Sequence, residues 1–235
     1  MENKDILFSI AKRLDLPDLL NFCNSSKKID EKIYKNIWDY KLNEFGDDID
    51  KLKHKFESKE LYELFYNCNK IKQSFKIKKS IYKLYKTEKL SLSFSLIYEI
   101  PKELGNLYNL KELYLDYNQI TEIPKELGNL SNLKELYLDY NQIKIIPKEL
   151  GNLTNLQYLD LQNNQITEIP KELGNLSNLQ YLDLSANQIK MIPIELGNLS
   201  NLQELNLYNN KIEMIPEELY NLSNLQEIYL SGNKI

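Results

Sequence analysis

One sequence feature constrains this chain more than any other: a segment of 23 residues recurs without insertions along its C-terminal part. An asparagine marks the same position of each copy, at Asn118, Asn141, Asn164, Asn187, Asn210 and Asn233. Prolines keep the same interval, at Pro101, Pro124, Pro147, Pro170, Pro193 and Pro216. Such a fixed step predicts small units that each bury their apolar face only by stacking on the next unit.

Residues 110–132, LKELYLDYNQITEIPKELGNLSN, give the local structure that one copy predicts. Leu113 and Leu115 alternate with polar neighbours, which is typical of a short strand with one buried face. Asn118 follows the strand, and stacked asparagine amides can bond backbone groups that leave the ladder. Pro124 prevents further pairing, so the rest of the copy returns on the opposite side in a helical or irregular turn.

The pattern LxxLxLxxNxIxxIPxxLxxL resembles the leucine-rich repeat, in its 23-residue intracellular form. The resemblance implies an α/β solenoid, a horseshoe with a parallel sheet on its concave face, preceded by an all-α N-terminal region. Residues 88–235 would form about six and a half units, the first degenerate, with Ser95 at the asparagine position, and the last truncated. The repeated asparagines would form a structural ladder, consisting of Asn118, Asn141, Asn164, Asn187, Asn210 and Asn233.

The outward strand positions predict an acidic, tyrosine-rich concave face that binds a target. It comprises Glu112, Tyr114, Asp116, Tyr117, Glu135, Tyr137, Asp139, Tyr140, Tyr158, Asp160, Tyr181, Asp183, Glu204, Tyr208 and Tyr229. Like charges on neighbouring strands repel, so a basic protein partner would stabilise this face. A solvated face copied by repeat duplication is the alternative interpretation.

Residues 5–45 carry apolar side chains at spacings of three and four, which predict short amphipathic helices. The segment ILFSIAKRLDLPDLLNFCNSSKKIDEKIYKNIWDYKL resembles an F-box, although Asn3-Lys4-Asp5 stands where that family has a Leu-Pro pair. The resemblance implies that residues 1–46 bind a Skp-type adaptor and, through it, a cullin ubiquitin ligase. The matching positions are Ile6, Leu7, Ile10, Leu14, Leu16, Leu19, Leu20 and Trp38. An ordinary helical cap on the solenoid is the alternative.

Residues 47–87 read as a helical linker or N-terminal cap, with many lysines that we interpret as a solvated helix face. The repeats also resemble those of Ras-pathway and polarity scaffolds of the Scribble type, which gives a second hypothesis, a scaffold with no ubiquitin role. The whole chain is similar to leucine-rich repeat proteins of giant DNA viruses such as mimivirus.

The composition gives no support for catalysis. The chain has one histidine and two cysteines, and the sequence contains no Gly-rich phosphate loop and no nucleophile paired with a base. We therefore expect no enzyme activity, metal or cofactor, and no nucleic-acid or membrane partner. Without a recognisable signal peptide we expect an intracellular, cytoplasmic protein, in a host cell if viral, and read the Asn-Leu-Ser/Thr sequons of the repeats as turns.

Overall fold

The computed structural model describes residues 37, 39–41, 58–78 and 80–235. The chain divides into two compact units, residues 1–85 and 86–235. The F-box-like residues Ile6, Leu7, Ile10, Leu14, Leu16, Leu19, Leu20 and Trp38 lie outside the described residues, so the adaptor-binding hypothesis stays a prediction.

In the first unit, the described helices are α4, Ser58–Ser74, and α5, Ile81–Tyr85. Leu61, Phe65, Cys68 and Ile71 recur on one side of α4 at spacings of three and four, and each is at most 1% exposed. Burial raises the pKa of the Cys68 thiol to about 12, so this side chain acts as a packed apolar group and not as a nucleophile.

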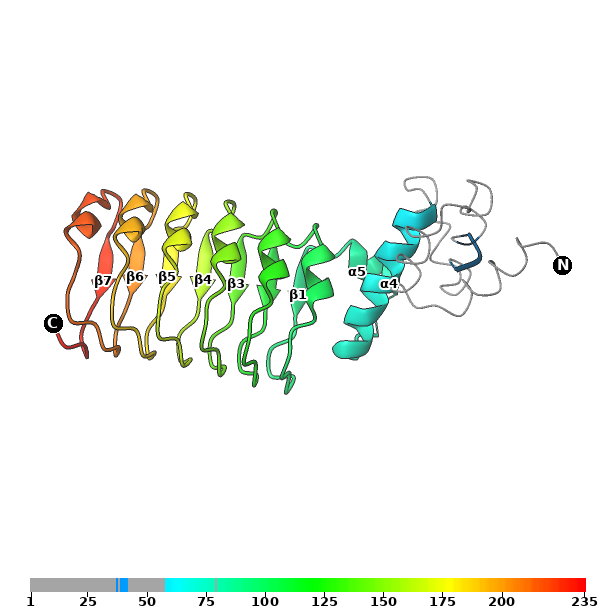
Figure 1. Ribbon diagram of the computed structural model, residues 1–235, viewed down its shortest axis with the longest axis horizontal. Helices are drawn as coiled ribbons and strands as arrows, with labels where there is room; N and C mark the ends of the chain where they lie inside the picture. Colours follow the sequence, from blue (N-terminus) through cyan, green and yellow to red (C-terminus); the bar gives the residue numbers. More distant parts are fainter. Residues whose placement is uncertain (1–36, 38, 42–57, 79) are drawn as a thin grey trace, which may run out of the picture. The chain divides into compact units, whose positions relative to one another are not determined.

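The second unit contains a parallel sheet of seven strands that pair in sequence order (Figure 1). The strands are β1 Lys89–Ser91, β2 Glu112–Tyr114, β3 Glu135–Tyr137, β4 Tyr158–Asp160, β5 Tyr181–Asp183, β6 Glu204–Asn206 and β7 Glu227–Tyr229. Every pair aligns equivalent repeat positions, as in Leu113 opposite Leu136. The predicted parallel leucine-rich repeat solenoid is confirmed.

The chain returns on the other side of each repeat through a short 3₁₀ turn. These turns are η2 Lys102–Asn106, η3 Lys125–Asn129, η4 Lys148–Asn152, η5 Lys171–Asn175, η6 Ile194–Asn198 and η7 Glu217–Asn221. A proline precedes each turn with an extended backbone, such as Pro124 at φ −66° and ψ 138°. The fixed φ of proline and its missing N–H end the strand-like segment at that point.

The core of each repeat is a set of seven aliphatic side chains. In the second repeat these are Leu110, Leu113, Leu115, Ile120, Ile123, Leu127 and Leu130, all at most 6% exposed. Each contributes roughly 1.5–3 kcal/mol when fully buried. Because neighbouring repeats cover the two sides of every set, this burial exists only in the stack.

Asparagines after the strands join each repeat to the previous one. Asn164 donates to Leu138 O at 2.9 Å in the previous repeat and to Leu161 O at 3.1 Å in its own. Its Oδ1 accepts the Ile143 N–H at 2.9 Å. Equivalent bonds recur at Asn118, Asn141, Asn187, Asn210 and Asn233. These amides satisfy backbone groups that the short strands leave unpaired.

A second asparagine row follows the 3₁₀ turns, and the sequence analysis did not identify it. Asn178 Nδ2 donates to Thr154 O at 2.7 Å, and Asn132, Asn155, Asn201 and Asn224 make the same bond to the preceding repeat. The 23-residue spacing of these asparagines was a visible signal for this role.

A glycine in each 3₁₀ turn from η2 to η6 sets how closely two repeats approach. A Cβ added at Gly128 would lie 2.2 Å from the backbone O of Glu149 in the next turn. The equivalent position in η7 carries Tyr220, which is 84% exposed and faces no following turn in the structure.

We predict that Gly128→Ala lowers the free energy of unfolding by about 2–4 kcal/mol, because the backbone of η4 must move away from the added methyl group. Chemical denaturation of the full chain measures this change. The matched control is Tyr220→Ala at the equivalent position, for which we expect a change within about 0.5 kcal/mol. Equal effects of both substitutions would contradict the close approach.

Candidate functional site

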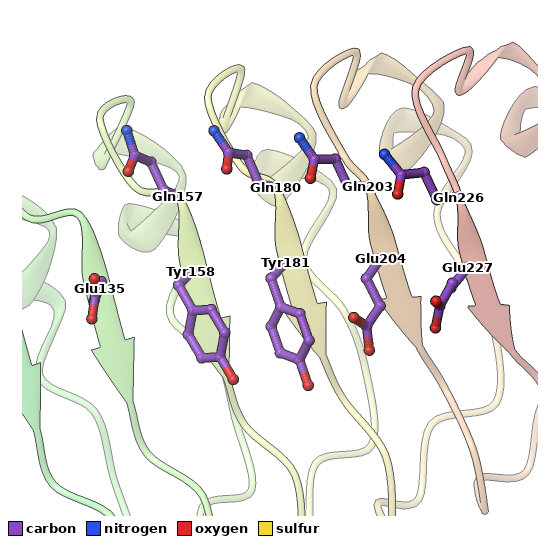
Figure 2. A pocket seen from close by; sticks show the side chains of 9 residues that line it. All are labelled: Glu135, Gln157, Tyr158, Gln180, Tyr181, Gln203, Glu204, Gln226 and Glu227. Carbon is purple, nitrogen blue, oxygen red and sulfur yellow. The ribbon is translucent and has the colours of Figure 1, made fainter.

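The outward sheet face, which we call the concave face, carries an open pocket across strands β3 to β7 (Figure 2). Its volume is about 330 Å³, and it is lined by Glu135, Gln157, Tyr158, Gln180, Tyr181, Gln203, Glu204, Gln226 and Glu227. No lysine or arginine lines this pocket. It offers carboxylates, carboxamides and two aromatic rings to a ligand, and no positive charge.

The glutamine row of this pocket, Gln157, Gln180, Gln203 and Gln226, was missing from the predicted site. These side chains precede the strands and lie beside one another along the pocket, with the glutamates and tyrosines as a second row (Figure 2). The predicted site began at the column of Glu135 and Tyr158 and did not include the residues just before it. The 23-residue recurrence of these glutamines, one position before the predicted column, was the signal that could have found them.

Tyrosines on adjacent strands stack into a continuous row, which we call the inner ring row: Tyr114, Tyr137, Tyr158 and Tyr181. Ring centroids are 4.6 Å apart between Tyr114 and Tyr137 and 4.2 Å apart between Tyr158 and Tyr181. Tyr137 contacts Tyr158 at 4.7 Å with a tilt of 30°. The tilt arises because Tyr158 pairs in register with Glu135, so the row shifts by one outward position between β3 and β4.

A second stack, the edge ring row, consists of Phe94, Tyr117 and Tyr140, just after the strands. Its centroids are 4.4 Å apart between Phe94 and Tyr117 and 4.3 Å apart between Tyr117 and Tyr140. Phe94 is 71% exposed and was absent from the predicted site. In the degenerate first repeat it occupies the column of Tyr117, and alignment to that column was the available signal.

Three aspartates that the sequence places on the outward face are buried. Asp139, Asp160 and Asp183 are 7%, 5% and 3% exposed. Asp183 is well provided with donors: the Ser185 N–H at 2.8 Å, the Asn206 amide at 2.8 Å and the Tyr181 hydroxyl at 3.2 Å. The alternation of outward and inward residues in the sequence does not reveal this burial.

Asp160 and Asp139 have fewer donors. Asp160 accepts hydrogen bonds from the backbone and side chain of Gln162, at 3.0 and 3.3 Å. Burial, with the nearby charges of Asp139 and Asp183, raises the pKa of Asp160 to about 7. Burial and the Asp116 charge raise the pKa of Asp139 to about 6. Both carboxyl groups therefore titrate near neutral pH, because their charged forms are poorly solvated.

At the β1–β2 end, the chain's own lysines neutralise the face. Lys89 Nζ lies 2.6 Å from Glu112 Oε2 and 4.5 Å from the centre of the Tyr114 ring. Lys111 Nζ lies 2.9 Å from Glu88 Oε2. The bond to Lys89 lowers the pKa of Glu112. The unneutralised negative charge of this face therefore begins beyond β2.

The remaining members of the predicted face lie along the same sheet. Glu204 and Glu227 pair directly across β6 and β7 and line the pocket. Desolvation, followed by the charge of Glu227, raises the pKa of Glu204. Tyr208 and Tyr229, at the β6–β7 end, are 52% and 45% exposed, and no ring contact joins them to the inner ring row among the described residues.

Two further features bear on the site. Among the described residues, no group of His, Cys, Asp or Glu has the arrangement of a metal site. None of the described helices is long and apolar enough to cross a bilayer.

We predict that Asp160→Asn stabilises the protein at pH 8 by about 1–3 kcal/mol and has no effect near pH 4. The folded pKa lies above the ordinary value of 3.8, so the folded chain holds this proton more tightly than the unfolded chain. The stability that the proton provides is complete below about pH 4 and is lost as the pH rises through about 7. Urea unfolding at both pH values measures the difference. A variant no more stable than the parent at pH 8 would show that Asp160 is fully satisfied as a carboxylate.

Comparisons with known proteins agree with this architecture. The family model "Leucine-rich repeat region" matches residues 61–162 and 146–234. A search of curated proteins finds no match.

Among solved structures, the chain is similar to the ectodomain of the plant receptor kinase GASSHO1/SCHENGEN3 from Arabidopsis thaliana, solved with CASPARIAN STRIP INTEGRITY FACTOR 2. The two share 38% identity over 63% of this chain and 18% of that one, with a TM-score of 0.60. A leucine-rich repeat protein of Leptospira interrogans shares 37% identity over 67% of this chain and 46% of its own, with a TM-score of 0.52.

An internalin from Listeria monocytogenes is 35% identical, over 62% of this chain and 40% of its own, with a TM-score of 0.53. The chain thus spans less than half the length of each of these proteins. The family model covers most of the chain. This protein belongs to the leucine-rich repeat family.

Proposed function

We propose that this protein is a recognition protein whose concave face binds a basic, extended segment of a partner protein. The observation that carries the proposal is the β3–β7 pocket, which is lined by three glutamates and no cation. The buried Asp139, Asp160 and Asp183 add negative charge to the same face. A positively charged partner would be attracted by the combined field of these groups and would contact the glutamates that line the pocket.

The pairing of like charges supports this proposal. Glu204 lies opposite Glu227 on neighbouring parallel strands, about 4.8 Å apart at the backbone, where two carboxylates repel by roughly 1 kcal/mol in water. A lysine or arginine side chain placed between them replaces this repulsion with two attractions. The stacked Tyr158 and Tyr181 beside them provide rigid contact area, as in many protein interfaces.

The solved relatives support the partner class. The Arabidopsis ectodomain was solved in complex with CASPARIAN STRIP INTEGRITY FACTOR 2, and its similarity covers 63% of the present chain. From this relative we carry over to the present chain only the class of activity, which is binding to another polypeptide without catalysis.

We predict that the double variant Glu204→Gln/Glu227→Gln binds a basic peptide about tenfold more weakly than the parent, because two charges of the pocket are removed. Fluorescence anisotropy with a labelled oligolysine peptide measures the affinity, which should also fall with added salt. The control is Glu122→Gln/Glu168→Gln, the same change in charge at exposed positions outside this pocket. Equal losses in both variants would reduce the interaction to net charge and contradict a specific pocket.

We further propose that the N-terminal segment makes this recognition protein a substrate adaptor of a cullin ubiquitin ligase. The support is the resemblance of residues 6–42 to an F-box, which would bind a Skp-type adaptor through apolar side chains. Such a role belongs in the cytoplasm of a eukaryotic cell. In the alternative proposal the chain is a stand-alone scaffold, and the same residues only cap the solenoid.

We predict that the full chain captures a Skp-type adaptor and cullin from eukaryotic cell extract, and that alanine at Leu19, Leu20 and Trp38 abolishes the capture. Immunoblotting of the captured proteins provides the measurement, and retained binding of a basic peptide shows that the repeats of the variant are folded. If neither the parent nor the variant captured the adaptor and cullin, the scaffold alternative would be favoured.

A further inference from the structure

The residue that follows the outward strand positions has a left-handed backbone in every repeat. Its φ is 55° at Phe94, 52° at Tyr117 and 51° at Tyr140. The later repeats carry Asn163, Ala186, Asn209 and Gly232 at this position, also with positive φ. Glycine and asparagine suit this conformation, whereas a bulky aromatic residue is disfavoured in it.

Burial does not compensate for the strain at the three aromatic residues. Phe94 is 71% exposed, and Tyr117 and Tyr140 are each 42% exposed. They gain the mutual stacking of the edge ring row, at 4.4 and 4.3 Å, but much of each ring remains in water. Strained residues that expose large apolar groups are concentrated at sites that contact ligands.

The two ring rows flank carboxylates. In the sequence, Asp116 lies between Tyr114 and Tyr117. Asp139 lies between Tyr137 and Tyr140. Asp116 accepts a hydrogen bond from Ser93 Oγ at 2.5 Å. Among the described residues no side chain donates to Asp139, and its own backbone amide is the group that lowers its pKa. Desolvation, Tyr140 and then the charges of Asp139 and Asp116 raise the pKa of the Tyr117 hydroxyl, so both carboxylates act at this edge.

A lysine of the chain itself already occupies one place where a ring and a carboxylate lie together. One strand earlier, Lys89 lies over the Tyr114 ring at 4.5 Å and bonds Glu112 at 2.6 Å, so a cation there uses a ring and a carboxylate together. On the next three strands the residues equivalent to Lys89 are Glu112, Glu135 and Tyr158, so no lysine fills this place there. Among the described residues, no lysine pairs with Asp116 or Asp139 or lies over the Tyr117 or Tyr140 ring, so the edge ring row lacks the internal cation that Lys89 supplies to Tyr114.

We propose that the edge ring row Phe94, Tyr117 and Tyr140, with the half-buried Asp116 as hydrogen-bond acceptor and the buried Asp139 as a nearby negative charge, is an anchor for an arginine side chain of the basic partner. The inference rests on the proposed function, since it assigns the specificity of the same face. A guanidinium is planar and weakly hydrated, stacks on aromatic groups and donates two parallel hydrogen bonds to a carboxylate. An ammonium can also lie over a ring and bond a carboxylate, as Lys89 does, but it is strongly hydrated and neither stacks in a plane nor forms a bidentate pair. The anchor therefore favours arginine over lysine.

The test compares labelled oligoarginine and oligolysine peptides of equal length, binding to the full chain at physiological salt. We expect the parent to prefer oligoarginine about tenfold, the size of a favourable ring and carboxylate contact. In Tyr117→Asn/Tyr140→Asn this preference should fall to about twofold or less. Asparagine stands at the equivalent positions Asn163 and Asn209 with the same backbone conformation, so the variant suits the fold. Its thermal melting is recorded beside that of the parent.

Two further variants separate the possible outcomes. Tyr117→Phe/Tyr140→Phe keeps the rings and should retain the preference for oligoarginine. Glu204→Gln/Glu227→Gln should weaken both peptides equally and leave their ratio unchanged. If the asparagine variant melts early, Tyr140→Asn alone, at the end of the row, replaces it in the comparison.

The outcomes distinguish this inference from the proposed function. A parent that binds both peptides equally, or an asparagine variant that keeps the preference, would overturn the arginine anchor while leaving a basic partner for the face. A parent that binds neither peptide would overturn the proposed function and the anchor with it.

Discussion

The hydrogen bonds of the asparagine ladder are the interaction on which the rest of this structure depends. Each strand has only three residues, so the sheet alone leaves backbone groups unpaired in the core. An amide such as that of Asn164 binds groups of two successive repeats and fixes their spacing and register. With that register fixed, the seven aliphatic side chains of each repeat meet their equivalents, and the core becomes continuous.

The same register determines the chemistry of the concave face. Equivalent residues of neighbouring repeats must lie side by side, whether or not their contact is favourable. Tyr158 and Tyr181 gain a stacked contact from this arrangement, whereas Glu204 and Glu227 repel each other. A repeat protein thus concentrates one kind of side chain along a line, and a partner with a complementary line of side chains can use all of them at once.

Several features of the concave face do not stabilise the fold but agree with a role in binding. Asp160 is buried with few donors, which raises its pKa to about 7, and Tyr117 and Tyr140 are held in a strained backbone conformation. Neither feature stabilises the fold, and later repeats carry residues that avoid the strain, such as Asn163 and Asn209. The costs are concentrated on the strands that carry the ring rows, which agrees with a binding role for that part of the face.

The sequence by itself determined the solenoid, because the 23-residue spacing of leucines, asparagines and prolines allows few other ways to bury an apolar face. It also determined that an acidic, tyrosine-rich face exists. Only the tertiary structure decided which of these residues are available to a partner. Asp183 is covered and bonded, the unpredicted Gln180 lines the pocket, and the inner ring row shifts between Tyr137 and Tyr158. Exposure and stacking depend on the neighbouring strand, which lies a full repeat away in the sequence, so local periodicity cannot report them.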